Sequence, residues 1–111
     1  MQLKFDIRDE ICIVTLKGRF TMDSDSEYTI VKEELEKRDL RKTIVNCAEL
    51  PSIDSTGLTF VVALHHMLKD RGGCIALTSV NARVHKLLEL THLLEFVPVF
   101  DDMDAAFAAI N

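Results

Sequence analysis

The first residues of the chain alternate between apolar and charged side chains. This alternation runs through residues 3–8, and residues 11–16 form a second run that is apolar nearly throughout. A period of two is typical of a β-strand with one face in the core. Asp9 and Glu10 separate the two runs, and Gly18 follows the second. The pattern predicts an opening β-hairpin that ends near Gly18.

Beyond Gly18, segments with helical spacing alternate with short apolar runs. The predicted helices cover residues 24–38, 55–71, 82–90 and 105–110, and the predicted strands cover residues 43–47, 74–78 and 96–100. Candidate N-caps are Asp23 or Ser24 for the first helix and Asn81 for the third. The order β-β-α-β-α-β-α-β-α indicates an α/β fold: a mixed, mostly parallel central sheet with about four helices packed against it. We expect residues 1–111 to form a single domain.

The helix that begins at Ser55 has two distinct faces when its residues are placed at ~100° intervals. The predicted core face contains Phe60, Ala63, Leu64, Met67 and Leu68, with Gly57 and Val61 at its margin. The opposite face contains Ser55, Leu58, Thr59, Val62, His66 and Lys69. Two interpretations of Leu58 and Val62 remain open: they form a small docking patch, or they pack under the preceding loop.

Composition narrows the classes of function. The 111 residues suffice for one modest core, and 48% are hydrophobic and 28% charged, which is typical of a soluble globular protein. No run reaches the ~18 apolar residues that a membrane span needs, so no membrane insertion is expected. The start lacks the apolar core of a signal peptide, which favours the cytoplasm. The net charge of −5 argues against direct nucleic-acid binding.

The three cysteines are far apart and lie in apolar or β-branched runs. Cys12, Cys47 and Cys74 form no CxxC pair, and we interpret them as buried free thiols that act as small hydrophobes. No cofactor and no metal are expected.

Ser55 is predicted at the N-terminus of its helix, directly after Asp54. The first N–H groups of a helix lack internal partners and the dipole there is positive, so this end can accept a phosphate on Ser55. Gly57 leaves the first turn open to another molecule. A phosphate would add ~−1.5 to −2 charge beside Leu58 and Val62 and expel a partner bound there. The simpler interpretation is that Asp54 and Ser55 only cap the helix.

Residues 50–58, Leu-Pro-Ser-Ile-Asp-Ser-Thr-Gly-Leu, resemble the signature of the STAS domain. This family includes bacterial anti-sigma factor antagonists and the cytoplasmic domains of sulfate transporters. The resemblance extends over essentially the whole chain. It implies that Ser55 is the phosphoacceptor, and that the unphosphorylated protein binds an anti-sigma factor that is also a serine kinase. Phosphorylation by that kinase would end the interaction, and a PP2C-type phosphatase would restore it.

The resemblance also places partner-binding residues around Ser55. These are Asp54, Thr56, Gly57, Leu58, Thr59 and Val62, with Thr21 and Asp23 from the segment after the hairpin. One position departs from the family pattern. Antagonists commonly carry an aspartate three residues after the glycine that ends the second strand, and here that residue is Thr21. Asp23 is the nearest carboxylate.

Two further possibilities remain open at this point, and a third is disfavoured. The domain could instead be a binding subunit of a larger assembly, such as a stress-signalling scaffold or a lipid-transporting ABC complex, without phosphorylation. It could also form a homodimer. An enzymatic function is disfavoured: His66 lies about 16 Å along the helix from Ser55, too far to act as its base, and the adjacent side chains of His65 and His66 diverge by ~100°.

Overall fold

A computed structural model describes residues 2–18 and 24–110 of the protein. Its elements, in chain order, are β1 (Gln2–Arg8), β2 (Ile11–Lys17), α1 (Ser24–Lys37), β3 (Lys42–Glu49), α2 (Ser55–Asp70), β4 (Cys74–Thr78), α3 (Ala82–Leu90), the 3-10 helix η1 (Leu93–Glu95), β5 (Val99–Phe100) and α4 (Met103–Ile110). The predicted order of strands and helices is confirmed.

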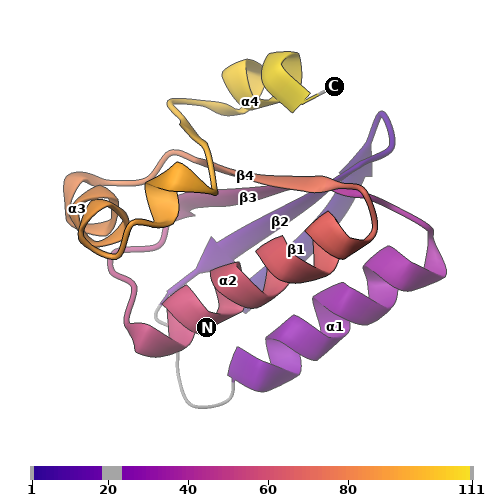
Figure 1. Ribbon diagram of the computed structural model, residues 1–111, viewed down its shortest axis with the longest axis horizontal. Helices are drawn as coiled ribbons and strands as arrows, with labels where there is room; N and C mark the ends of the chain where they lie inside the picture. The colour runs from indigo at the N-terminus through magenta and orange to yellow at the C-terminus, as the bar shows by residue number, and fades with distance from the viewer. Residues whose placement is uncertain (1, 19–23, 111) are drawn as a thin grey trace.

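The strands form one five-stranded sheet in the order β1-β2-β3-β4-β5. β1 pairs with β2 in antiparallel orientation, and all other neighbours are parallel. Figure 1 shows α1 and α2 side by side on one face of the sheet, α4 on the other face, and α3 at the end where β4 finishes. The predicted α/β fold, with a mostly parallel sheet opened by a hairpin, is therefore confirmed.

The hairpin turn consists of Asp9 and Glu10, both with positive φ, 52° and 66°. Positive φ at both central residues defines a type I′ turn, whose twist matches that of the flanking strands. Arg8 and Ile11 form the strand pair that closes this turn. A two-residue loop therefore fixes the register of the whole antiparallel pair.

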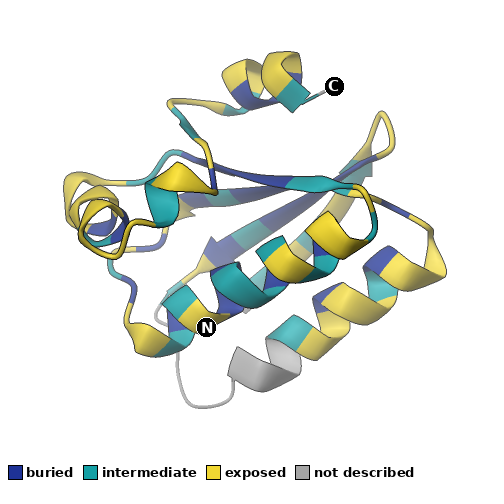
Figure 2. Ribbon diagram, in the orientation of Figure 1, coloured by how far each residue is buried: buried dark blue, intermediate teal, exposed yellow. Residues whose placement is uncertain are grey.

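The sheet separates two apolar clusters of unequal size. The larger lies between the sheet and α1 and α2, with contributions from α3. The smaller, under α4, contains Ile11, Ile13, Ile44, Ala106 and Phe107. Figure 2 shows buried residues along the central strands and exposed residues on the outer faces of α1 and α2. The core therefore depends on the inner faces of these helices and leaves their outer faces free to vary.

Two details differ from the sequence predictions. The predicted strand at residues 96–100 contains only Val99–Phe100, because Phe96 and Val97 both donate their N–H groups to Leu93 O and continue the turn of η1. On α2, Gly57 and Val61 are buried, whereas Ala63 and Met67 are only half-buried. The buried face of α2 is therefore rotated toward its predicted margin.

The prediction for the cysteines is confirmed for two of the three. Cys12 and Cys47 are buried, and burial raises the pKa of each thiol to about 12. Cys74 is only half-buried, because it is the first residue of β4 and lies near the exposed Gly72 turn.

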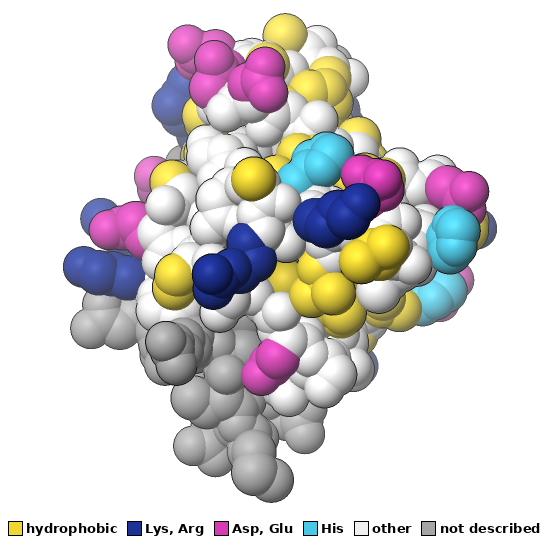
Figure 3. Space-filling model, turned by 90° about the vertical axis from the view of Figure 1, so that its left-hand side faces the viewer, with side chains coloured by type: hydrophobic (Ala, Val, Ile, Leu, Met, Phe, Trp, Pro, Cys, Tyr) yellow, Lys and Arg dark blue, Asp and Glu magenta, His cyan; other side chains and the backbone are white. Residues whose placement is uncertain are grey.

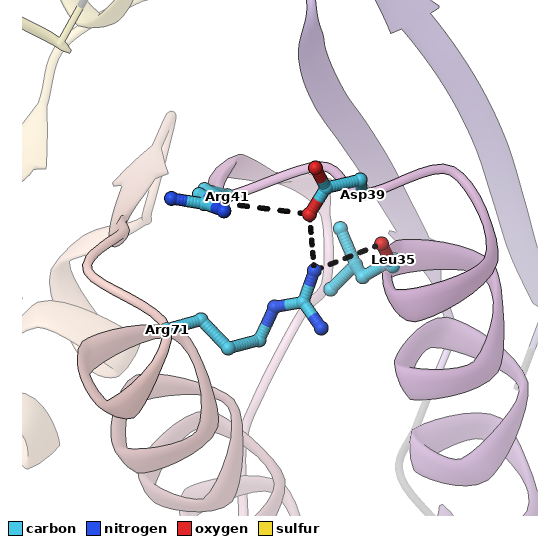
Figure 4. Close-up of polar contacts among 4 residues, drawn as sticks. All are labelled: Leu35, Asp39, Arg41 and Arg71. Atoms are coloured by element: carbon cyan, nitrogen blue, oxygen red, sulfur yellow. Dashed lines mark hydrogen bonds and ion pairs between the residues drawn. The ribbon is translucent and has the colours of Figure 1, made fainter.

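The C-terminal end of α2 is joined to the α1–β3 connection by polar contacts. Arg71 Nη2 donates to Leu35 O (3.5 Å) and to Asp39 Oδ1 (3.3 Å), and Arg41 Nε lies 3.6 Å from the same carboxylate oxygen. Figure 4 shows the two arginines converging on Asp39 from separate elements. Gly73 follows, where an added Cβ would overlap the carbonyl oxygen of Arg41. These contacts hold the end of α2 that is remote from Ser55.

Candidate functional site

Ser55 is the first residue of α2, and Asp54 caps that helix. Asp54 has extended backbone angles, and its Oδ1 accepts the N–H of Gly57 at 3.0 Å. Its carbonyl accepts the N–H of Leu58 at 2.9 Å. The helix starts here because the aspartate satisfies one of the N–H groups that the first turn leaves without a partner. The Ser55 side chain is exposed at this end.

Two further N–H groups of the first turn remain available. Those of Ser55 and Thr56 have no acceptor among the residues that the structure describes. They carry the positive end of the helix dipole, which favours an anion close to Ser55. Gly57 is buried, whereas the sequence analysis expected it to leave the first turn open to another molecule. An anion attached to Ser55 would therefore meet free donors without displacing the cap.

The loop before Ser55 is anchored on both sides. Leu50 and Ile53 are buried in the larger core cluster, so the exposed Pro51 lies between two fixed points. Asn81 donates from Nδ2 to Leu50 O (3.3 Å) and to Pro51 O (3.0 Å), while its Oδ1 accepts the N–H of Val84 (2.8 Å). One side chain thus caps α3 and holds the loop.

The sequence analysis identified only one of these roles of Asn81. The cap was predicted from its position before a helix, and this is confirmed. The contact with the loop joins residues about 30 positions apart, and no local pattern could have revealed it. The available signal was topological, since the carboxyl ends of adjacent parallel strands lie at one edge of the sheet.

The sequence left two interpretations of Leu58 and Val62 open, a docking patch or packing under the preceding loop, and the structure agrees partly with each. Leu58 is half-buried and packs against the larger core cluster, and Val62 is also half-buried. Thr59 is exposed, but its Oγ1 donates to Ser55 O at 2.8 Å. Each aliphatic side chain therefore keeps part of its surface accessible beside Ser55, and Thr59 presents an acceptor rather than a donor.

Figure 3 views the molecule from the end that carries the start of α2 and α3. Hydrophobic side chains gather there in one patch, with lysine, arginine, histidine and acidic side chains around them. The large hydrophobic residues exposed on the segment from α3 onward are Leu90 and Phe96. An apolar patch with a polar rim is the composition of a protein-docking surface of modest size.

The histidines form a separate feature from Ser55. The rings of His65 and His66 lie 5.4 Å apart, and His65 lies 6.1 Å from Phe96. Burial, followed by the nearby His66 and Lys69, lowers the pKa of His65. Over residues 2–18 and 24–110, no group of three or more His, Cys, Asp or Glu side chains could hold a metal ion.

Seven of the nine predicted site residues lie at the start of α2 and its cap. Asp54, Ser55, Thr56, Gly57, Leu58, Thr59 and Val62 are brought together there by helical spacing. Thr21 and Asp23 lie outside the described residues, and their predicted contribution stays a prediction.

Comparison with known families gives a match over nearly the whole chain. The model of the STAS domain family matches residues 2–106. This chain belongs to the STAS domain family. The anti-sigma F factor antagonist of Paenibacillus polymyxa is 25% identical over 103 residues, which cover 92% of this chain and 88% of that protein.

Solved STAS structures show the same fold. The crystal structure of TM1081 from Thermotoga maritima has a TM-score of 0.92 and 24% identity, covering 97% of this chain and 93% of that one. The anti-sigma factor antagonist SpoIIAA in its unphosphorylated form has a TM-score of 0.83 and 15% identity, with coverage of 97% and 96%. The Bacillus protein SpoIIAA in its phosphorylated form has a TM-score of 0.77, 15% identity, and coverage of 99% and 100%. At these identities the structures establish the STAS fold alone.

Among the described helices of this STAS domain, none is long and apolar enough to cross a membrane.

Proposed function

We propose that this protein is an anti-sigma factor antagonist that binds an anti-sigma factor when Ser55 is unphosphorylated and releases it when Ser55 is phosphorylated. The observation that carries the proposal is the exposed Ser55 at the capped N-terminus of α2, beside two N–H groups that find no acceptor within residues 2–18 and 24–110. The antagonist named for Paenibacillus polymyxa supports the same class of function.

The chemistry of the switch is local. Phosphorylation adds ~−1.5 to −2 charge and three acceptor oxygens at a helix end whose dipole favours negative charge. Leu58 and Val62, each half-buried, lie within about two turns of the modified residue. A partner that covers these aliphatic side chains would have to bury the phosphate as well, and the desolvation of that charge opposes binding.

The partners of this switch are those that the resemblance to anti-sigma factor antagonists implies. The anti-sigma factor would also be the serine kinase that uses Ser55 as its substrate, and a PP2C-type phosphatase would reverse the reaction. The protein itself would then act as a substrate and binding module, not as an enzyme, in the cytoplasm. Asp54, Thr56, Leu58, Thr59 and Val62, with Thr21 and Asp23, would form the contact surface, and the buried Gly57 would lie beneath it.

The test is intact-mass spectrometry of the protein purified from its native cells. The wild type is compared with a Ser55→Ala variant and with a Thr56→Ala variant as the matched control, since Thr56 is the neighbouring hydroxyl. We expect a phosphate-sized mass increment in the wild type and in Thr56→Ala, and its absence from Ser55→Ala. The serine-kinase anti-sigma factors of the same organism, purified singly, should bind the protein only when the increment is absent.

A phosphate that persists in Ser55→Ala and disappears from Thr56→Ala would move the switch by one residue. The absence of any increment, even after incubation with these kinases and ATP, would overturn the phosphorylation switch. It would favour a binding subunit of a larger assembly that works without phosphorylation.

A further inference from the structure

β1 is an edge strand with an unusually open outer side. The other edge of the sheet, β5, contains only two residues and follows Pro98, which has no N–H to donate. β1 contains seven residues, and no strand lies on its outer side in the described part of the chain. A long edge of this kind is a template for another strand.

The hairpin determines which backbone groups of β1 face outward. The two-residue turn closes on the hydrogen-bonded pair Arg8–Ile11, and such pairs alternate along an antiparallel ladder. Leu3, Phe5 and Ile7 therefore direct their N–H and C=O groups away from β2. The contacts agree, because the N–H of Ile7 is accepted by the exposed carboxylate of its neighbour Asp6 at 2.8 Å.

We propose that β1 pairs with β1 of a second copy of this chain, antiparallel and centred on Phe5. In this register Phe5 lies opposite the second copy's Phe5, and Leu3 lies opposite its Ile7. These are the residues whose backbone groups face outward, so each pair can exchange two hydrogen bonds. The two sheets would join into one continuous sheet across the two-fold axis.

Charge selects this register over its neighbours. Centred on Phe5, Lys4 lies opposite the second copy's Asp6, at a non-hydrogen-bonded position where side chains are closest. A shift that keeps the hydrogen-bond pattern brings either Lys4 against Lys4 or Asp6 against Asp6, and in the second case also Lys4 against Arg8. Because like charges directly opposite are unfavourable, the centred register is the complementary one of these three.

The apolar face of β1 agrees with the same partner. Leu3, Phe5 and Ile7 are half-buried and pack against the larger core cluster. In the pair, each would meet an identical apolar row, and both rows would lie on the side of α1 and α2. A single strand pair buries little surface, so the dimer should be weak and depend on concentration. Ser55 takes no part, so this inference stands or fails independently of the proposed function.

The test is sedimentation equilibrium of the wild type and three charge variants, up to the solubility limit. Lys4→Asp and Asp6→Lys each place like charges opposite one another at both symmetric positions, and we expect the dissociation constant to rise about tenfold or more. The double variant Lys4→Asp/Asp6→Lys exchanges the charges and should dimerise like the wild type. An equimolar mixture of the two single variants should form heterodimers.

Lys4 and Asp6 are exposed, so the variants should fold, and circular dichroism checks this. A wild type that stays monomeric at every concentration would overturn the proposal and leave this edge to a strand of another protein. A dimer that responds to none of the charge variants would also overturn it, since its interface would lie elsewhere.

Discussion

Asn81 joins the cap of α3 to the loop that leads into Ser55, and its replacement by alanine should destabilise both. The substitution removes the acceptor for the N–H of Val84, a cap worth about 1 kcal/mol. It also removes two donations, to Leu50 O and Pro51 O. Because these contacts are partly exposed, each should contribute about 0.5 kcal/mol. The free energy of unfolding should fall by about 2 kcal/mol in total.

Asn81→Ser is the matched control, because a serine caps a helix about as well as asparagine but is too short to reach both carbonyls. It should lose only the loop contacts, about 1 kcal/mol. Urea unfolding measures both variants, and the slope of the transition should not change if only the native state is affected. Amide hydrogen exchange should accelerate at Gly57 and Leu58 in both variants, since the loop before them loses its anchor.

Three outcomes would refute parts of this reasoning. If Asn81→Ala costs less than about 0.5 kcal/mol, the contacts with the loop and α3 contribute nothing measurable. If Asn81→Ser and Asn81→Ala have the same unfolding free energy, the cap of α3 is not part of the effect. Unchanged exchange at Gly57 and Leu58 would show that Asn81 does not position the start of α2.

Two further predictions concern a glycine that lies against the α1–β3 connection and two buried cysteines. Gly73→Ala should lower the free energy of unfolding by about 3 kcal/mol or more, measured by heat or urea, because its Cβ would overlap Arg41 O. Gly72→Ala is the control and should lower it by only about 1 to 2 kcal/mol. The φ of Gly72 is +75°, but nothing lies within 4 Å of an added Cβ. Equal costs for the two glycines would contradict the close approach. Burial raises the pKa of the Cys12 and Cys47 thiols to about 12, so the unfolded thiols ionise at lower pH than the folded ones. The stability that these thiols contribute below about pH 9 should therefore be lost between about pH 9 and 12. Cys47→Ala should flatten the alkaline decline in urea-unfolding free energy, and an unchanged slope would exclude this cause.

The sequence was sufficient for most of the fold because its signals are local. Alternation in residues 3–8 predicted β1, and Asn81 as an N-cap predicted the start of α3. The prediction failed at residues 96–98, where apolar and β-branched residues favour a strand but the backbone continues η1. Strand propensity reflects how well a residue fits a half-buried sheet surface. Val97 is buried in the core, but it lies in a turn and not in a strand.

The candidate site was predicted less completely, and the reason is distance along the chain. Helical spacing alone placed Ser55, Leu58 and Val62 together on one face. The Asn81 contact and the half-burial of Leu58 depend on tertiary packing, which the spacing does not contain. Helical spacing also placed Gly57 and Val61 at the margin of the core face, whereas the structure buries both.

The separation between the inner and outer faces of α2 has a consequence for how such proteins can diversify. Positions such as Ser55, Thr59 and His66 are exposed, so most substitutions there should change stability by only about 0.5 kcal/mol. Phe60, Leu64 and Leu68, on the inner face, are held by the core. Duplicated copies of the gene could therefore acquire different partners by drift on the outer face alone, and several such copies could coexist in one cell without cross-talk.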